Sequence, residues 1–214
     1  MATAVYLNSA SSNPFQATKG KYAAQSVRAV PIRVLSVGKK RSRELQLMVD
    51  EYAEKIKYYC SFEDVQIRPN PRNARDQRAQ VDDEDAAMMN HIRSDDWYVD
   101  IGANVIDGIA NGFHELIDDI GNRNLIQVVM LDERGQDIRS EEMAELIGNA
   151  GNMGASRLSF CIGGPYGHGR KMRERANKSI KLSSLVLNHQ IALLVLMEQL
   201  YRSWTILKGQ NYHH

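Results

Sequence analysis

The chain has 214 residues, of which 43% are hydrophobic and 25% charged, and its formal net charge is +1. This length and composition suit one globular domain with a sizeable core, and the net charge favours no particular partner, so a surface for nucleic acid would have to be a local patch. Two cysteines are too few for a disulfide framework or a cysteine-based zinc site, and no run of about 18 apolar residues predicts a membrane span.

The N-terminal region differs in composition from the rest of the chain. Residues 1–43 contain no aspartate or glutamate, and the first 28 are rich in alanine and serine with a few basic residues. This composition is typical of a plastid or mitochondrial transit peptide, and the alternative is a disordered tail. We therefore predict that residues 1–28 lie outside the fold and that residues 29–214 form one domain, with an unusual insertion of uncertain structure at about residues 100–125.

The remaining segments alternate between two kinds of pattern. In chain order they predict a strand over 31–38, a helix over 41–60, a strand over 62–68, a charged helical stretch within 70–96, a strand over 126–135 that ends in a polar turn, a helix over 140–151, a strand over 157–164, a basic helical stretch over 170–179, a strand over 180–188 and a helix over 189–209. Ser140 is a candidate N-cap, and Gly151 and Gly209 are candidate helix ends. Strands alternating with helices predict an α/β domain with a mostly parallel sheet flanked by helices.

The last of these helices, 189–209, is apolar nearly all round. Such a helix has to be buried on more than one side. We predict that it has one face in the core and one face against a second subunit.

Four glycines follow one predicted strand in the sequence FCIGGPYGHG, residues 160–169. Glycines placed after a strand indicate that backbone comes close to a ligand or to the chain itself. The spacing matches neither the G-x-G-x-x-G dinucleotide fingerprint nor the P-loop, and no acidic residue follows at the distance that ribose binding needs. On pattern alone, a tight turn and a ligand-binding loop both stay open.

Other chemistry-bearing residues give weaker signals. Basic residues gather at 170–181 and at 39–43, which suits either a phosphate contact or a solvated face. The histidines show no metal-ligand spacing, and no nucleophile motif for acyl transfer is present. His189 begins a helix, where a structural role is favoured over that of a base.

Three segments together carry a resemblance to a family. VVMLDERGQDIRSEEMAEL, the strand and loop FCIGGPYGHG, and the C-terminal NHQIALLVLMEQLYRSWTILKGQNYHH resemble the RlmH-type methyltransferases of the SPOUT class. The resemblance extends from Ile32 to His214 apart from the insertion. Together with the transit-like N-terminus, it makes the chain similar to a plant organellar member of the family. It implies a C-terminal trefoil knot, a homodimer, and methylation of N3 of a pseudouridine in large-subunit ribosomal RNA.

The resemblance also implies a cofactor and the residues that serve it. The cofactor is S-adenosylmethionine, and its contacts fall on Leu131, Gly164, Leu182, Ser183, Ser184, Leu185, Val186 and Leu187. A methyl donor that carries no phosphate needs backbone polar groups and an apolar slot, which glycines and leucines can supply. Candidate catalytic residues are Arg202, Tyr212, His213 and His214, with Arg202 holding RNA and the tail completing the site across the dimer. Tyr166-Gly167-His168 departs from the family pattern, in which an acidic or small residue is followed by Gly-Leu.

These expectations define the partners and the alternatives. We expect ribosomal RNA or the ribosome and a second copy of the chain as partners, with no membrane and no metal, in the chloroplast rather than the mitochondrion. The first alternative is a non-catalytic RNA- or ribosome-binding protein that keeps the knot fold. The second is a nucleotide-binding α/β protein, which would bind ATP or NAD instead.

Overall fold

The computed structural model describes residues 22–69, 76–93 and 127–211. Its elements are β1 (Ile32–Val37), α1 (Arg43–Lys57), β2 (Phe62–Ile67), α2 (Gln77–Arg93), β3 (Gln127–Asp137), α4 (Ser140–Asn152), β4 (Leu158–Ile162), α5 (Arg170–Arg175), β5 (Lys178–Lys181) and α6 (His189–Leu207). The predicted insertion at 100–125 lies outside the described residues. The five strands form one sheet in the order β2-β1-β4-β3-β5, and every pair is parallel, as the alternating pattern predicts.

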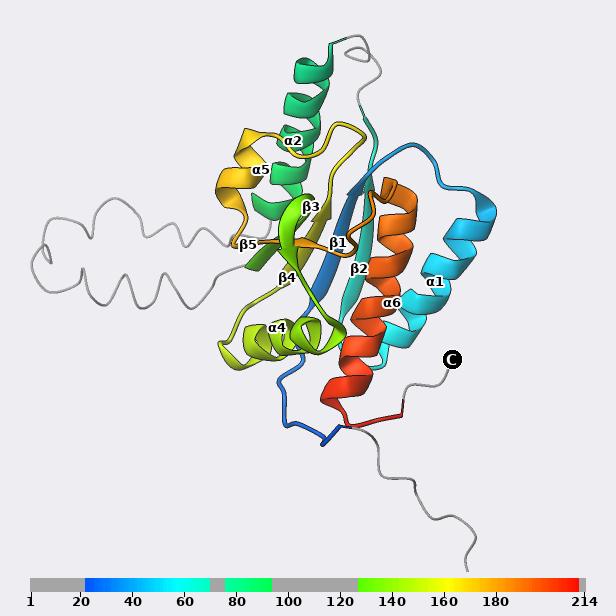
Figure 1. Ribbon diagram of the computed structural model, residues 1–214, viewed down its shortest axis with the longest axis vertical. Helices are drawn as coiled ribbons and strands as arrows, with labels where there is room; N and C mark the ends of the chain where they lie inside the picture. Colours follow the sequence, from blue (N-terminus) through cyan, green and yellow to red (C-terminus); the bar gives the residue numbers. More distant parts are fainter. Residues whose placement is uncertain (1–21, 70–75, 94–126, 212–214) are drawn as a thin grey trace, which may run out of the picture.

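Helices cover both faces of the sheet (Figure 1). Helices α1, α4 and α6 pack together on one face, and α2 and α5 pack together on the other. Because the central strands are buried on both faces, they are apolar without alternation: β4 reads LSFCI and is buried throughout. The sheet flanked by helices is confirmed, and the trefoil knot stays a prediction.

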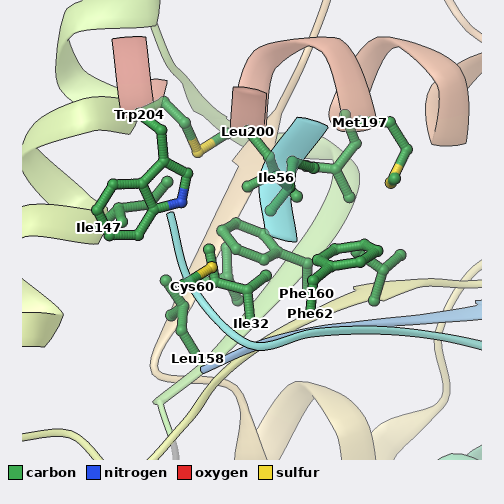
Figure 2. Packing of buried hydrophobic residues seen from close by; sticks show 14 of the residues in the cluster. Ile32, Ile56, Cys60, Phe62, Ile147, Leu158, Phe160, Met197, Leu200 and Trp204 are labelled. Atoms are coloured by element: carbon green, nitrogen blue, oxygen red, sulfur yellow. The ribbon is translucent and has the colours of Figure 1, made fainter. Parts of the chain in front are cut away.

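The larger core lies between the sheet and α1, α4 and α6 (Figure 2). Trp204 of α6 is fully buried there and stacks on Tyr59, with the ring centroids 5.8 Å apart. Phe160 and Ile32 reach this core from the sheet. A smaller core under α2 and α5 includes Met88 and Met172. The predicted core face of α6 is therefore confirmed.

Residues just before β1 pack on the same layer of helices. The N–H of Gln25 donates to the carbonyl of Leu207 at 2.8 Å, and Val30 is 1% exposed. Gly209, with φ of +61°, turns the chain at the end of α6, and a Cβ there would lie 2.6 Å from the backbone nitrogen of Ala24. The predicted helix end at Gly209 is thus confirmed, and part of the segment before residue 28 lies against α6.

Three local predictions were wrong. Gly151 lies inside α4, and the left-handed residue after the helix is Gly154, with φ of +79°. The N-cap of α4 is Arg139, and Ser140 is the first helical residue. The strand expected over 180–188 ends at Lys181, because the LSSLVL stretch that follows has no neighbouring strand among the described residues on which to continue a ladder.

The predicted polar turn after β3 is a bulge within that strand. Leu131 and Gln136 both pair with Ile180 of β5, so the residues between them are displaced from the ladder. Gly135 passes so close to β5 that a Cβ would lie 2.5 Å from the carbonyl carbon of Ile180. Only glycine permits this close approach of the bulge to β5.

Candidate functional site

A cavity of about 720 Å³ opens where β3, β4 and β5 end. Leu131 of β3 pairs with Ile162, the last residue of β4, and with Ile180, next to the last residue of β5, so the bulge of β3 begins where its two neighbours end. The carboxyl edge of a parallel sheet is where α/β proteins bind ligands. The walls come from three segments: the bulge of β3, the glycine loop 163–169, and residues 182–189 with Ala192 of α6.

The glycine loop is folded back on itself. The N–H of Gly167, with φ of +78°, donates to the carbonyl of Gly164 at 3.0 Å. A Cβ on Gly163 would lie 2.8 Å from the carbonyl carbon of Gly167, so two stretches of backbone meet there with no room for a side chain. The loop is therefore both a tight turn and a wall of the cavity, and the two interpretations of its glycines are compatible.

Helix α2 supports the glycine loop from behind. Asp85 is 4% exposed and accepts hydrogen bonds from the N–H groups of Gly169, at 2.9 Å, and Met172, at 3.3 Å. A side chain on Gly169 would collide with this carboxylate, since its Cβ would lie 2.3 Å from Oδ2. Asp85 thus fixes the end of the glycine loop and the start of α5 together.

Glu84, beside it, faces the loop at Gly164. Its Oε1 accepts from Gln80 at 2.8 Å, whereas Oε2 is buried and has no hydrogen-bond partner among the described residues. Burial raises the pKa of Glu84 above its ordinary value. A Cβ on Gly164 would lie 2.5 Å from Oε2, so a side chain at this position would point toward α2.

His168 joins the glycine loop to β3. Its side chain is buried, and its Nε2 lies 3.0 Å from the carbonyl oxygen of Leu131. Burial lowers the pKa of His168 below its ordinary value, so the ring is neutral near pH 7 and Nε2 donates to the carbonyl. His168, where the sequence departs from the family pattern, therefore forms a hydrogen bond inside the protein.

Asp132 and Arg173 form an ion pair at the cavity wall, with 2.6 Å between Oδ2 and the guanidinium nitrogen. Burial disfavours the Asp132 carboxylate, but the N–H of Arg134 and the charge of Arg173 outweigh it, so the pKa of Asp132 is lowered. Arg173 also donates from Nε to the carbonyl of His168 at 3.2 Å. The bulge, the loop and α5 are thereby tied into one charged wall.

We expect His168→Gln to flatten the pH dependence of stability. The unfolded chain takes up a proton on this imidazole below about pH 6.5, whereas the folded protein resists it. Stability linked to His168 is therefore fully present above about pH 6.5 and is lost as the pH falls below it. Urea unfolding between about pH 5.5 and 7.5 measures this, and an equal loss of stability in wild type and variant would contradict it.

The third wall is an apolar loop. The hydroxyl of Ser183 accepts from the N–H of Leu185 at 2.9 Å, which turns the chain after β5. Leu185 and Val186 are 75% and 83% exposed. Asn188 then caps α6 by accepting from the N–H groups of two residues in its first turn. Exposed apolar side chains at a cavity rim are typical of a surface that a ligand covers.

The structure brings together most of the predicted cofactor residues. Leu131, Gly164, Leu182, Ser183, Leu185, Val186 and Leu187 all line the cavity, whereas Ser184 is exposed and is not among the lining residues. Arg202 lies apart from them: it donates to Glu198 at 2.6 and 2.9 Å and follows His189 by 13 positions of α6, about 20 Å at 1.5 Å per residue. Tyr212, His213 and His214 lie outside the described residues.

No pattern in the sequence assigned several of the lining residues to the site. Asp132 and Arg173 belong to polar stretches that the sequence pattern presented as a turn and a basic helix. His189 lines the cavity as well, beside Asn188. Gly163 was visible in the glycine cluster, and its closeness to Gly167 is what sets it apart. Pairings of β3 with both neighbours bring these residues together, and such pairings are not evident in a single sequence.

In the described part of the chain, no helix is long and apolar enough to cross a membrane, and no three potential ligands cluster as a metal site would require. Both cysteines are buried, and burial raises the pKa of each thiol to about 12, so neither offers a thiolate near neutral pH.

Sequence comparison finds methyltransferases among the relatives of this chain. A family model described as "Predicted SPOUT methyltransferase" matches residues 30–123 and 113–213. An Arabidopsis thaliana protein named "Putative RNA methyltransferase" is 60% identical over 208 residues, which cover 96% of this chain and 92% of that protein. Ribosomal RNA large subunit methyltransferase H of Christiangramia forsetii is 30% identical over 185 residues, covering 86% and 98%. The solved SpoU methyltransferase AviRb of Streptomyces viridochromogenes, in complex with AdoMet, has a TM-score of 0.40 and 11% identity, covering 83% and 59%.

Proposed function

Because the chain belongs to the SPOUT methyltransferase family, we propose that it is an S-adenosylmethionine-dependent RNA methyltransferase whose substrate is N3 of a pseudouridine in large-subunit ribosomal RNA. The nucleotide and its position follow the name of the relatives that share the whole length of the domain. The observation that carries the proposal is the cavity, where the predicted cofactor segments meet at the carboxyl edge of the sheet.

The residues of the cavity fit this cofactor. The glycine loop places backbone at the cavity wall, and the apolar side chains of Leu182, Leu185 and Leu187 suit an adenine ring. The volume of about 720 Å³ lies within the usual range for a cofactor site. Bound there, S-adenosylmethionine supplies an electrophilic methyl group.

The protein has to orient the base and remove one proton. N3 of pseudouridine is a poor nucleophile until its proton leaves, so a base or a water molecule must lie beside it. Our candidates are Tyr212, His213 and His214, with Arg202 holding an RNA phosphate or the base. The neutral, buried His168 and the ion pair of Asp132 with Arg173 keep the wall rigid and are not candidates for this transfer.

A second copy of the chain would bring Arg202 and the C-terminal tail to the cavity. Arg202 follows Ala192, the last lining residue on α6, by 10 positions, about 15 Å along the helix, so we propose that it contributes to the site of a partner chain. The outer sides of α1 and α6 expose Leu47, Met48 and Ile191 at 59%, 46% and 46%. We propose that this apolar surface forms the interface of a homodimer and that residues 1–28 direct the protein to the chloroplast.

Calorimetric titration of the full chain with S-adenosylmethionine tests the cofactor directly. We expect one site per chain with micromolar affinity, and no heat from ATP or NAD at the same concentrations. Binding of ATP or NAD in place of S-adenosylmethionine would support a nucleotide-binding protein. A folded chain that binds none of the three would support the non-catalytic alternative.

A further inference from the structure

Three cations at the junction of β1 and α1 are exposed and unpaired, and one of them, Arg43, is the first residue of α1. Lys39, Lys40 and Arg43 are exposed, and within the described residues none of them forms an ion pair or a side-chain hydrogen bond. On α1, by contrast, Lys55 pairs with Glu51 and Lys57 pairs with Glu54. The short segment 38–43, called here the β1–α1 loop, is therefore a local concentration of positive charge on a chain of net charge +1.

The backbone of the β1–α1 loop is held firmly although its lysines are free. The N–H of Gly38 donates to the carbonyl of Ile67 at 3.0 Å, and Gln66 donates to the carbonyl of Lys39 at 2.6 Å. Arg41 is buried, donates to Ser36 at 2.8 Å and pairs with Asp64. One basic residue thus anchors the loop, and its neighbours project into solvent from a fixed position, which lowers the entropic cost of binding.

The loop lies beside the cavity. His189, which lines the cavity, packs so closely on the loop that a Cβ on Gly38 would lie 3.1 Å from its imidazole. A small depression lined by both Lys39 and His189 joins the two regions. A nucleotide that enters the cavity would therefore bring its neighbouring phosphates close to this loop.

The other basic segment, around α5, is largely neutralised. Arg173 pairs with Asp132, Lys181 with Asp137 at 3.3 Å, and Arg170 lies 3.6 Å from Glu174. Only Lys171 and Lys178 remain exposed there without an ion pair among the described residues. The β1–α1 loop thus offers three unpaired cations against two around α5, and cations that neutralise phosphates release the counterions of the RNA, so we favour the loop as the phosphate contact.

We propose that Lys39 and Lys40, assisted by Arg43, bind the phosphate backbone of the RNA substrate next to the methylated base. The inference rests on the proposed function, since it takes RNA as the substrate. It assigns to this loop the positioning of RNA and no part in holding the cofactor. The loss of these charges would weaken RNA binding and its salt dependence and would leave cofactor affinity unchanged.

The test compares K39Q/K40Q with the matched control K171Q/K178Q, which removes two lysines that are also exposed from the segment at α5. Binding of the full chain to purified ribosomes that lack the methyl group is measured by co-sedimentation over a series of KCl concentrations. For K39Q/K40Q we expect about tenfold weaker binding and a salt slope reduced by about 1.5, from roughly 0.7–0.9 per phosphate contact. The control should keep the wild-type slope, and both variants should keep the wild-type unfolding midpoint.

The result separates this inference from the proposed function. A wild-type slope in K39Q/K40Q, a reduced slope only in K171Q/K178Q, or no salt-dependent binding of the wild type to ribosomes would overturn the role of the loop. Calorimetry with S-adenosylmethionine on the same three proteins reports on the enzyme independently. If the loop variant loses RNA binding while the wild type binds no S-adenosylmethionine, the RNA contact stands and the methyltransferase assignment fails.

Discussion

Gly163→Ala should abolish measurable S-adenosylmethionine binding while leaving a folded protein. A Cβ at this position would lie 2.8 Å from backbone atoms of Gly167, and backbone cannot turn aside as a side chain can. The two backbone stretches of the glycine loop that meet at Gly163 and Gly167 would have to separate, at a cost of about 1–3 kcal/mol typical of overpacking. Since the loop is one wall of the cavity, we expect at least about a hundredfold loss of affinity by calorimetry, which corresponds to about 2.7 kcal/mol.

Gly164→Ala provides the matched comparison. The Cβ there would meet the side chain of Glu84 on α2, so the collision can be relieved by removing that side chain. We expect a smaller loss of affinity than for Gly163→Ala, and recovery in the double variant with Glu84→Ala. Equal affinity of Gly163→Ala and wild type would show that the loop is not part of the cofactor site.

Asp85→Ala should give the largest loss of stability among the residues of the site. The substitution leaves the N–H groups of Gly169 and Met172 buried without an acceptor, at about 1–3 kcal/mol each. We expect the free energy of unfolding in urea to fall by about 2–4 kcal/mol, together with weaker S-adenosylmethionine binding because the glycine loop is released. Asp82→Ala, at an exposed position of the same helix, should change stability by less than about 0.5 kcal/mol.

A small effect of Asp85→Ala, equal to that of Asp82→Ala, would mean that water replaces the carboxylate and that α2 does not support the loop. A large loss of stability with unchanged cofactor affinity would separate the two roles. In that case Asp85 would serve the fold alone, and the rigidity of the loop would have to come from His168 and Arg173.

The sequence was informative where a local pattern decides the structure. The apolar run of β4, the spacing of α1 and the glycine after α6 each specify a conformation through their own residues, and those elements agree with the prediction. The LSSLVL segment was mistaken for strand because apolar and β-branched residues also suit a cavity wall. Whether such a segment forms a ladder depends on a neighbouring strand, which a local pattern does not contain.

The family motifs predicted most of the site, whereas the chemical character of single residues predicted less of it. Leu131, Gly164 and most of residues 182–187 line the cavity, as the resemblance implied. Neither motif nor spacing indicated that Asp85 of α2 would cap a helix 84 residues further along the chain. The same holds for Gly164, where a side chain would meet Glu84 of α2. Contacts between distant segments are set by packing, and they decide how rigid the site is.

The most direct test of the account is the product of the reaction. The full chain is incubated with S-adenosylmethionine and with ribosomes that lack the modification, and the large-subunit RNA is digested and mapped by mass spectrometry. We predict one added methyl group, at N3 of a single pseudouridine, and none with Gly163→Ala. A wild-type protein that binds S-adenosylmethionine and ribosomes but adds no methyl group to this RNA, or adds it to a different base, would contradict the proposed function.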